Sequence, residues 1–310
     1  MSKIRVGVLR GGPSVEHEIS LLTGANVLTN LVEDKYQAID IFISKSGQWP
    51  AFPEVDVIFN ALHGEYGEDG QVQSVLEKKS LPYTGSGVAA SALAMDKWAS
   101  RQLFQRAGLK TPPAINLQFS SFKIQDYQKI KYDLPWVVKP ANRGSSLGVS
   151  LVNNEKEFHP ALSKAFQYDD SVLVEQYIKG REVTCGILEN FQGEKYFALP
   201  VIEIVLPLGK PLFDYQGKYD GSTQEICPGI FGEKTALAIQ EAASLAHQSL
   251  GCRDYSRVDM IVAEDGIYVL EVNTLPGLTK ESLFPKAAAV VGCSFDRLLD
   301  HLLTLALERQ

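Results

Sequence analysis

Short apolar runs and helical segments alternate from the start of the chain to about Met95. The apolar runs lie at Ile4–Leu9, Ile39–Ile43 and Val55–Leu62, and a helix is predicted after Ser14. Runs of this length are typical of buried strands. Because helices separate them, they indicate parallel strands that are covered on both faces. We therefore predict an α/β sheet for this part of the chain.

Two further regions follow, and each has its own pattern. The first runs from about Asp96 to Lys179, and the second begins near Gly180. Their predicted elements are a helix at Asp96–Ala107, a break at Pro112–Pro113, strands near Trp136–Val138 and Val172–Tyr177, a long helix from Glu233 to about Leu250, a hairpin, and a C-terminal helix from about Phe295. We therefore predict three domains, at residues 1–96, 97–180 and 181–310.

Composition narrows the class of protein. Hydrophobic residues make up 45% of the 310 residues and charged residues 22%, which is ordinary for a chain with a buried core and excludes a disordered one. The apolar run Val88–Met95 is about half the roughly 18 residues that a membrane-spanning helix needs. The N-terminus lacks the pattern of a signal peptide. We expect a cytoplasmic protein with no membrane partner.

Charge and cysteine content argue against two further classes of site. The chain has 30 basic and 37 acidic residues and a net charge of −7, so we expect no nucleic-acid partner. The four cysteines are scattered and form no C-x-x-C pair. That spacing argues against a zinc site and against a disulfide scaffold.

The most informative segment is a predicted hairpin that ends in two acids and an asparagine. Asp265-Gly266 is a strong turn signal between two β-rich runs. A three-residue loop from Glu264 to Gly266 gives one coherent apolar face. The pairs of that face are Val258 with Val272, Met260 with Leu270, and Val262 with Tyr268, and those of the opposite face are Asp259 with Glu271 and Arg257 with Asn273.

The opposite face of this hairpin indicates a metal site. It sets two carboxylates roughly 5 Å apart at the backbone, with an amide oxygen two residues along. Like charges at that spacing repel, so a cation is needed, and hard oxygen ligands of this kind suit Mg²⁺. The alternative is an ordinary solvent-facing hairpin in which Arg257 neutralises Asp259. Ile261 and Val269 share that face, which argues against full solvation.

A glycine-rich loop offers a site for an anion. Its sequence is Lys139-Pro-Ala-Asn-Arg-Gly-Ser-Ser-Leu-Gly148, between two strand-like runs, so its backbone N–H groups could hold phosphate and Lys139 could neutralise it. The loop is neither a Walker A sequence nor a G-x-G-x-x-G fingerprint. Taken alone it could be a plain turn. Together with the acid pair downstream it indicates a site for a nucleotide and magnesium.

The order of these motifs carries a resemblance. They follow one another as Lys97, the Lys139 loop, Glu175-x-x-Ile178, Arg257-x-Asp259 and Glu271-x-Asn273. This order resembles the ATP-grasp superfamily, and the D-alanine–D-alanine ligase family in particular. Strings similar to the signatures of that family are Gly11-Gly-Pro-Ser-Val-Glu-His-Glu-Ile-Ser20, His63-Gly-Glu-Tyr-Gly-Glu-Asp-Gly70, and Glu271-Val-Asn-Thr-Leu-Pro-Gly-Leu-Thr279 with Ser282-Leu283 beyond.

The resemblance implies a fold and a reaction. The fold is a three-domain ATP-grasp architecture, in which an N-terminal parallel α/β domain precedes two α+β domains that clasp ATP. The reaction is the ADP-forming ligation of two D-alanines for peptidoglycan, with ATP and two Mg²⁺ (or Mn²⁺) as cofactors. ATP would phosphorylate the carboxylate of the first D-alanine, and the amine of the second would attack the acylphosphate. The resemblance also implies a homodimer.

The resemblance further implies roles for individual residues. On the substrate side these are Glu16 for the first ammonium, His63 for the first carboxylate, Arg257 and the Gly277 amide for the tetrahedral oxyanion, and Ser282 with Leu283 for the second carboxylate. On the nucleotide side they are Lys97, Lys139, Ser145 and Ser146 at the phosphates, Glu175, Gln176 and Ile178 around the adenine, and Glu182 at the ribose. The metal ligands would be Asp259, Glu271 and Asn273.

A closing loop is also implied, because an acylphosphate hydrolyses when water enters. The glycine-punctuated segment Phe213–Gly221 would form it. Lys218 would approach the transferred phosphate. Tyr219 would reach Ser145 and Glu16, and any of these three could take part in removing the proton from the second ammonium.

Simpler interpretations remain open. Without the resemblance, Glu16 is an acid at the start of an exposed helix turn, His63 is a satisfied histidine at a strand end, and Lys97 is a solvated lysine. For the whole protein the rivals are a ligase that makes D-alanyl-D-lactate, a nucleotide-binding regulatory protein without catalysis, and a dinucleotide oxidoreductase. By the resemblance, Tyr219 favours the dipeptide over the ester, because ester-forming relatives differ in this segment. The missing G-x-G-x-x-G fingerprint argues against the oxidoreductase.

Overall fold

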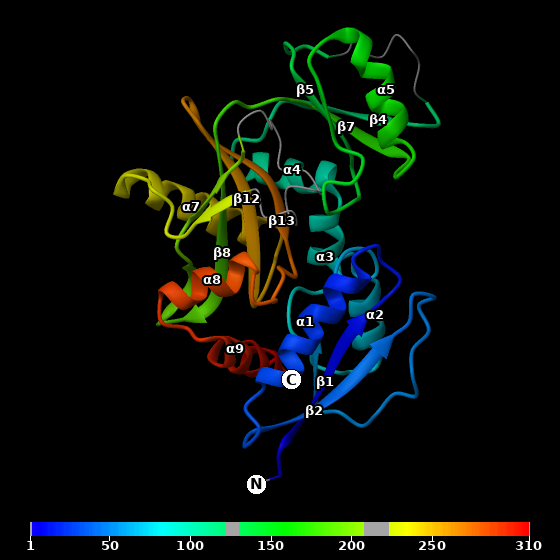
Figure 1. Ribbon diagram of the computed structural model, residues 1–310, viewed down its shortest axis with the longest axis vertical. Helices are drawn as coiled ribbons and strands as arrows, with labels where there is room; N and C mark the ends of the chain where they lie inside the picture. Colours follow the sequence, from blue (N-terminus) through cyan, green and yellow to red (C-terminus); the bar gives the residue numbers. More distant parts are fainter. Residues whose placement is uncertain (1, 122–129, 208–222, 310) are drawn as a thin grey trace.

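Three β-sheets, with helices between and around them, make up the computed structural model, which describes residues 2–121, 130–207 and 223–309. Figure 1 shows the sheets spread along the longest axis of the molecule, with the C-terminal sheet between the other two. The predicted mixed α/β class is confirmed. Within the described ranges, no helix has both the length and the apolar character needed to cross a membrane.

The first sheet is parallel, as the apolar pattern predicts. Its central strand, β1, carries Val6 and Val8, which pack on the side of α1, and Leu9, which packs on the side of α2. Both faces are therefore covered, which explains the continuous apolar runs. The elements of this unit are β1 (Ile4–Gly11), α1 (His17–Asn30), β2 (Tyr36–Ile43), β3 (Val57–Asn60), α2 (Gln71–Lys78) and α3 (Val88–Met95).

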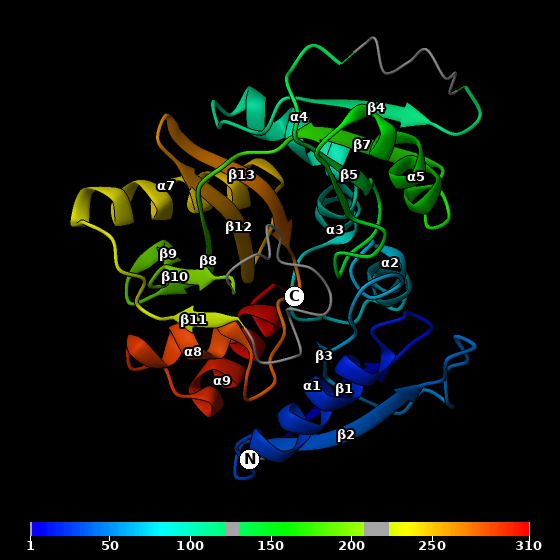
Figure 2. The ribbon, with the colours of Figure 1, turned by 45° about the horizontal axis from the view of Figure 1, so that its top comes forward.

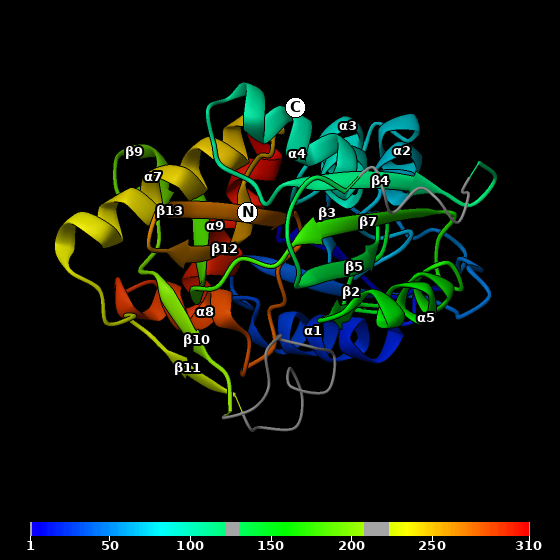
Figure 3. The ribbon, with the colours of Figure 1, turned by 90° about the horizontal axis from the view of Figure 1, so that it is seen from above.

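The second sheet is antiparallel and has the strand order β4, β7, β5, β6. Helix α4 (Lys97–Arg106) leads into it and begins at Asp96, whose carboxylate accepts the backbone N–H groups of Trp98 and Ala99, both at 2.9 Å. This cap fixes the start of the helix and therefore the position of Lys97, its first residue. Helix α5 packs on β5 and β6 (Figure 3). The bounds are β4 (Ala114–Gln118), β5 (Trp136–Pro140), β6 (Ser150–Val152), α5 (Glu155–Ala165) and β7 (Ser171–Gln176).

The third sheet is antiparallel and runs β11, β10, β8, β12, β13, with β9 also paired to β8. Helix α7 packs along one face of it (Figure 2). The bounds are β8 (Arg181–Phe191), β9 (Glu194–Ala198), β10 (Ile202–Val205), β11 (Gln224–Ile226), α7 (Glu233–Ser249), β12 (Tyr255–Ala263), β13 (Gly266–Asn273) and α8 (Leu283–Val290).

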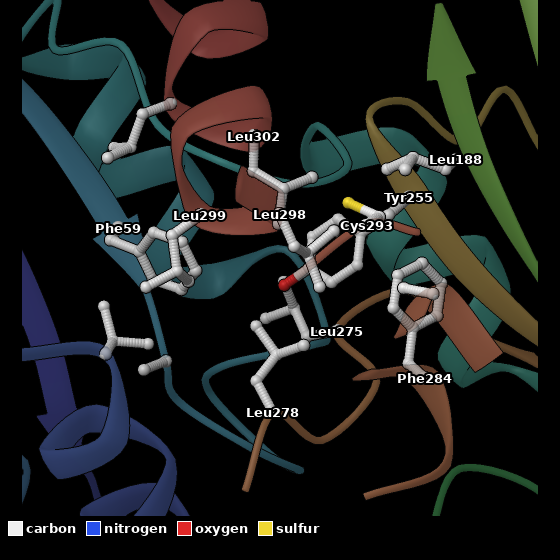
Figure 4. Packing of buried hydrophobic residues seen from close by; sticks show 14 of the residues in the cluster. Phe59, Leu188, Tyr255, Leu275, Leu278, Phe284, Cys293, Leu298, Leu299 and Leu302 are labelled. Atoms are coloured by element: carbon white, nitrogen blue, oxygen red, sulfur yellow. The ribbon is translucent and has the colours of Figure 1, made fainter. Parts of the chain in front are cut away.

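The last helix, α9 (Phe295–Leu307), returns to the N-terminal sheet. Leu298, Leu299 and Leu302 of this helix are fully buried. They share one core with Phe59 of β3, as Figure 4 shows. The two ends of the chain therefore form one packed body, although the sequence pattern gives no sign of this contact.

The predicted hairpin register is correct at its charged end and wrong at its turn. Pairing is as predicted up to Asp259, which faces Glu271. A β-bulge then shifts the register by one, and the loop is Glu264-Asp265 rather than three residues. The pairs beyond the bulge are Met260 with Val269, Ile261 with Tyr268, Val262 with Ile267, and Ala263 with Gly266.

Packing accounts for the bulge. Val269 is only 1% exposed and shares a core with Met260, whereas Leu270 lines a cavity. A bulge leaves one residue of a strand unpaired and re-aims its neighbours. Strict alternation of apolar and polar residues cannot indicate such an insertion.

Candidate active site

Two cavities share Glu271 in their walls. The first has a volume of about 430 Å³ and is lined mainly by the second and third sheets, and the second has a volume of about 690 Å³ and is lined by the N-terminal unit and the third sheet. The residues with predicted roles in the first are Lys97, Lys139, Ser146, Glu175, Gln176, Ile178, Glu182, Asp259 and Glu271. Those in the second are Glu16, His63, Ser145, Arg257, Glu271, Asn273, Gly277, Ser282 and Leu283.

Lys218 and Tyr219 are the predicted site residues not assigned to either cavity. Both belong to the segment Phe213–Gly221, which lies outside the described residues. The prediction of a closing loop therefore stays a prediction.

Lys139 and Glu175 form an ion pair in the wall of the first cavity. Lys139 lies near the end of β5, and Glu175 lies on the neighbouring strand β7. The Lys139 Nζ is 2.7 Å from the Glu175 Oε2, and both side chains are nearly buried. The carboxylate thus neutralises the lysine in a place where an unpaired charge would be costly.

Lys97 is held in a similar way. Its Nζ is 3.0 Å from the Glu271 Oε2 and donates to the backbone carbonyl of Arg143 at 2.7 Å. Only 10% of the Lys97 side chain is exposed, so the interpretation of a solvated lysine is wrong. Because Arg143 belongs to the glycine-rich loop, Lys97 connects that loop to the acidic end of the hairpin.

Asp259 is bonded by several side chains at this end of the hairpin. Its carboxylate accepts from the Arg257 Nε and Nη2, both at 3.0 Å, and from the Asn273 Nδ2 at 3.0 Å. Thr184 of β8 donates its hydroxyl at 2.6 Å. Burial alone would lower the pKa of the Arg257 guanidinium, but the charge and hydrogen bonds of Asp259 outweigh burial and hold it above the usual value. Arg257 therefore stays a cation in the site.

The donor set at this position fits a hard divalent cation. Asp259 and Glu271 face each other across the hairpin, and Asn273 adds an amide oxygen two residues along. In the described ranges there is no group of three or more His, Cys, Asp or Glu side chains that could hold a metal. Mg²⁺ commonly takes one or two carboxylates from the protein and completes its shell with substrate phosphates and water. The arrangement fits a cation that enters together with a nucleotide.

The glycine-rich loop reaches the second cavity through Ser145. Its hydroxyl donates to the Glu16 Oε1 at 2.6 Å, from a position 129 residues away in the sequence. Ser145 and Ser146 both have left-handed backbones, with φ of 53° and 55°. Residues other than glycine rarely adopt this conformation, and such positions gather at ligand sites.

His63 is buried and bonded on both ring nitrogens. The Nε2 lies 2.8 Å from the Thr23 hydroxyl, and the Nδ1 lies 3.3 Å from the Glu68 carboxylate. The interpretation of a satisfied histidine is thus correct as geometry, although His63 also lines the second cavity. Glu68 lines the same cavity, although the sequence predicts no role for it. Its position five residues after His63, within the segment His63–Gly70, could have indicated one.

The pKa of the Glu68 carboxyl is raised above its ordinary value. Burial raises the pKa of its carboxyl, the nearby charge of Glu16 raises it further, and the hydrogen bond from His63 offsets this only in part. A carboxyl whose pKa is higher in the folded state takes up a proton on folding. Stability therefore falls as the pH rises from the unfolded pKa, about 4.3, through the folded one.

We expect Glu68→Gln to remove this pH dependence. The free energy of unfolding of the variant minus that of the wild type should increase between about pH 4 and 8. Each tenfold change in proton affinity corresponds to about 1.4 kcal/mol. Urea unfolding across this range measures the difference, with Glu33→Gln as an exposed control. A difference that does not change with pH would contradict the assignment.

The far end of the second cavity is built around the start of α8. The Ser282 hydroxyl accepts from the Thr279 backbone N–H at 3.0 Å and lies 2.8 Å from the Thr279 hydroxyl. A Cβ at Gly277 would lie 2.9 Å from that Ser282 oxygen, so a side chain there would crowd it. Leu283 begins the helix, whose N-terminal end favours anions through its N–H groups.

Comparisons with known proteins identify a family for the chain. The family model described as D-ala D-ala ligase N-terminus matches residues 5–54 and 50–86, and the model described as D-ala D-ala ligase C-terminus matches residues 103–304. A D-alanine–D-alanine ligase of Syntrophobacter fumaroxidans is 42% identical over 99% of this chain and 98% of that relative.

Solved structures give the same result. The VanG D-Ala:D-Ser ligase of Enterococcus faecalis has a TM-score of 0.87 and 30% identity, over 98% of this chain and 100% of that one. The D-alanine–D-alanine ligase of Bacillus anthracis complexed with ATP has a TM-score of 0.83 and 33% identity, over 99% of this chain and 98% of that one. The chain therefore belongs to the D-alanine–D-alanine ligase family.

Proposed function

We propose that this protein joins two D-alanines to D-alanyl-D-alanine at the expense of ATP, for peptidoglycan precursor synthesis. The observation that carries the proposal is the shared wall of the two cavities at Glu271. One cavity holds the lysines expected for phosphates, and the other holds paired charges suited to an amino acid. A shared wall lets a phosphoryl group pass from the first to the second.

The nucleotide binds in the first cavity in this proposal. Lys97 and Lys139 exchange their carboxylate partners for phosphate oxygens, Glu175, Gln176 and Ile178 border the adenine, and Glu182 contacts the ribose. Ser145 and Ser146 cover the phosphates through the loop. Two Mg²⁺ or Mn²⁺ ions would be held by Asp259, Glu271 and Asn273. These ions would neutralise phosphate charge during transfer.

The two amino acids bind in the second cavity. Glu16 takes the ammonium of the first D-alanine, and His63 lies near its carboxylate. Arg257 and the Gly277 N–H stabilise the oxyanion that forms when the second amine attacks the acylphosphate. Ser282 and the N–H of Leu283 receive the second carboxylate at the start of α8.

Further parts of the proposal rest on the family resemblance. Lys218 and Tyr219 act from a closing segment, Lys218 at the phosphate and Tyr219 with Ser145 and Glu16. The chain divides into domains at 1–96, 97–180 and 181–310, with α9 packed back onto the first. The protein acts as a homodimer in the cytoplasm, where ATP is available, and binds neither nucleic acid nor a membrane.

The test is phosphate release from ATP and Mg²⁺ together with chromatography of the products. D-Alanine should drive release and yield the dipeptide, whereas L-alanine should not. Mixed reactions with D-lactate or D-serine examine the acceptor, since one similar structure is a D-Ala:D-Ser ligase. Turnover that requires D-lactate or D-serine beside D-alanine would overturn the dipeptide assignment, and ATP binding without turnover would favour a regulatory protein.

A further inference from the structure

A buried arginine next to the nucleotide cavity is only partly bonded. Arg101 lies on α4, one turn after Lys97, and is 4% exposed. Its Nη2 donates to the Thr111 hydroxyl at 3.0 Å and to the Pro112 carbonyl. Within the part of the chain that the structure describes, its Nε and Nη1 have no hydrogen-bond partner. Donors of a buried charged group that lack a hydrogen bond lower the stability of the folded state, so a function for them is expected.

Glu175 is the acid whose charge acts most strongly on this guanidinium. The segment bonded to Arg101 continues into β4, whose Ala114 pairs with Glu175 on β7. Pro113 accepts the backbone N–H of Gln176 at 2.8 Å, which fixes the two segments together. Burial lowers the pKa of the Arg101 guanidinium, and the charge of Glu175 is the largest of the effects that oppose it. Arg101 is thus linked, through Pro112 and the start of β4, to the strand that carries Glu175.

We propose that Arg101 is a positioning residue of the nucleotide site, which receives the carboxylate of Glu175 when a nucleotide phosphate draws Lys139 away. The inference rests on the proposed role of Lys139 in binding ATP. Without such an exchange, nucleotide binding would leave Glu175 as an unpaired, buried anion. The three unpaired N–H groups on Nε and Nη1 supply the hydrogen bonds that the carboxylate loses.

The exchange explains why two cations serve one carboxylate. Lys139 is the partner of Glu175 in the structure, at 2.7 Å. Arg101 is anchored by Thr111 and Pro112 and is not among the described residues that line the first cavity, so it is not placed to bind the phosphate itself. Its fork of donors can bind a carboxylate through two parallel hydrogen bonds, which a single ammonium cannot do.

The test is the affinity for ATP with Mg²⁺, measured by calorimetry in the absence of D-alanine. Arg101→Met should weaken ATP binding by roughly 30-fold, because Glu175 is left uncompensated once Lys139 engages phosphate. Adenosine, which has no phosphate, should bind the variant and the wild type within about threefold of each other. Arg106→Met, on the same helix and exposed, is the matched control and should bind ATP as the wild type does.

A second variant separates this role from a purely structural one. Glu175→Gln in the Arg101→Met background should restore most of the lost ATP affinity, since a neutral amide needs no cation. Loss of the bonds to Thr111 and Pro112 would not be repaired in that way. Arg101→Lys, which keeps a charge, should retain affinity within about tenfold of the wild type.

The proposal is overturned if Arg101→Met binds ATP normally, if Glu175→Gln gives no recovery, or if Arg101→Lys loses as much affinity as Arg101→Met. Dipeptide formation by the wild type is measured on the same preparation. Its absence would instead overturn the proposed function, so the two failures are distinguishable.

Discussion

Replacing Glu271 by glutamine should lower turnover by roughly 10²–10³-fold, which corresponds to a loss of about 3 to 4 kcal/mol in transition-state stabilisation. Among the described residues, Glu271 is the one that lines both cavities. In the structure it pairs with Lys97, at 3.0 Å, and stands opposite Asp259 on the hairpin. The amide keeps the shape of the side chain but removes the charge that holds Lys97 and that would ligate magnesium. The rate of D-alanine-dependent phosphate release at saturating ATP measures the effect.

The matched control for this variant is Glu264→Gln. Glu264 lies in the exposed turn at the other end of the same hairpin, so the chemical change is identical and the site is untouched. Titration with Mn²⁺, followed by paramagnetic resonance, provides a second measurement: Glu271→Gln should weaken Mn²⁺ binding in the presence of ATP. Turnover within about threefold of the wild type would show that Glu271 is not a metal ligand of consequence.

The hairpin illustrates how far a sequence pattern can reach. The apolar alternation was sufficient to set Asp259 opposite Glu271, because a slip of one residue would have turned the apolar side chains out of the core. It could not indicate the bulge that follows. The bulge arises from packing of Val269 against Met260 in three dimensions, and it costs only one unpaired residue.

Contacts between distant segments lie beyond such patterns. Helix α9 packs against the N-terminal sheet, so Leu299 and Phe59 share one core. Neither segment has a sequence pattern that predicts this contact. Helix α5 is absent from the predicted elements, and it contains Pro160 although proline usually interrupts a helix.

In the site, too, the sequence predicts some features and only the fold shows the others. Motifs located the charged residues along the chain, but their pairing depends on the fold. The Lys139–Glu175 pair follows from the pairing of β5 with β7 inside the second sheet. The Lys97–Glu271 pair follows from the packing of α4 against β13 of the third sheet. Arg101 belongs to none of the sequence motifs. Only the structure shows that its Nε and Nη1 lack hydrogen-bond partners among the described residues.

The second large effect is expected at the C-terminal end of the chain, where Arg309→Met should lower the free energy of unfolding by about 3 kcal/mol. Arg309 follows α9 and donates to the carboxylate of Asp254, with Nη2 at 3.0 Å, and to the Tyr83 carbonyl at 2.7 Å. Asp254 is 0% exposed and also accepts the Gly85 N–H at 2.7 Å. Removal of the arginine leaves a buried carboxylate without its main cation, between the N-terminal unit and the third sheet. Urea unfolding measures the loss.

The pH dependence of this loss identifies its cause. Burial raises the pKa of Asp254, and Arg309 is the largest effect that opposes burial. Without Arg309 that pKa rises further, so the carboxyl becomes protonated at a higher pH and no longer needs a cation. The penalty of Arg309→Met should therefore be smallest in acid and grow as the pH rises. In the Asp254→Asn background the same change should cost little, and Arg297→Met, at an exposed position of α9, should cost little at any pH. A penalty that stays constant with pH, or that survives in the double variant, would assign the effect to lost packing of the arginine stem instead of its charge.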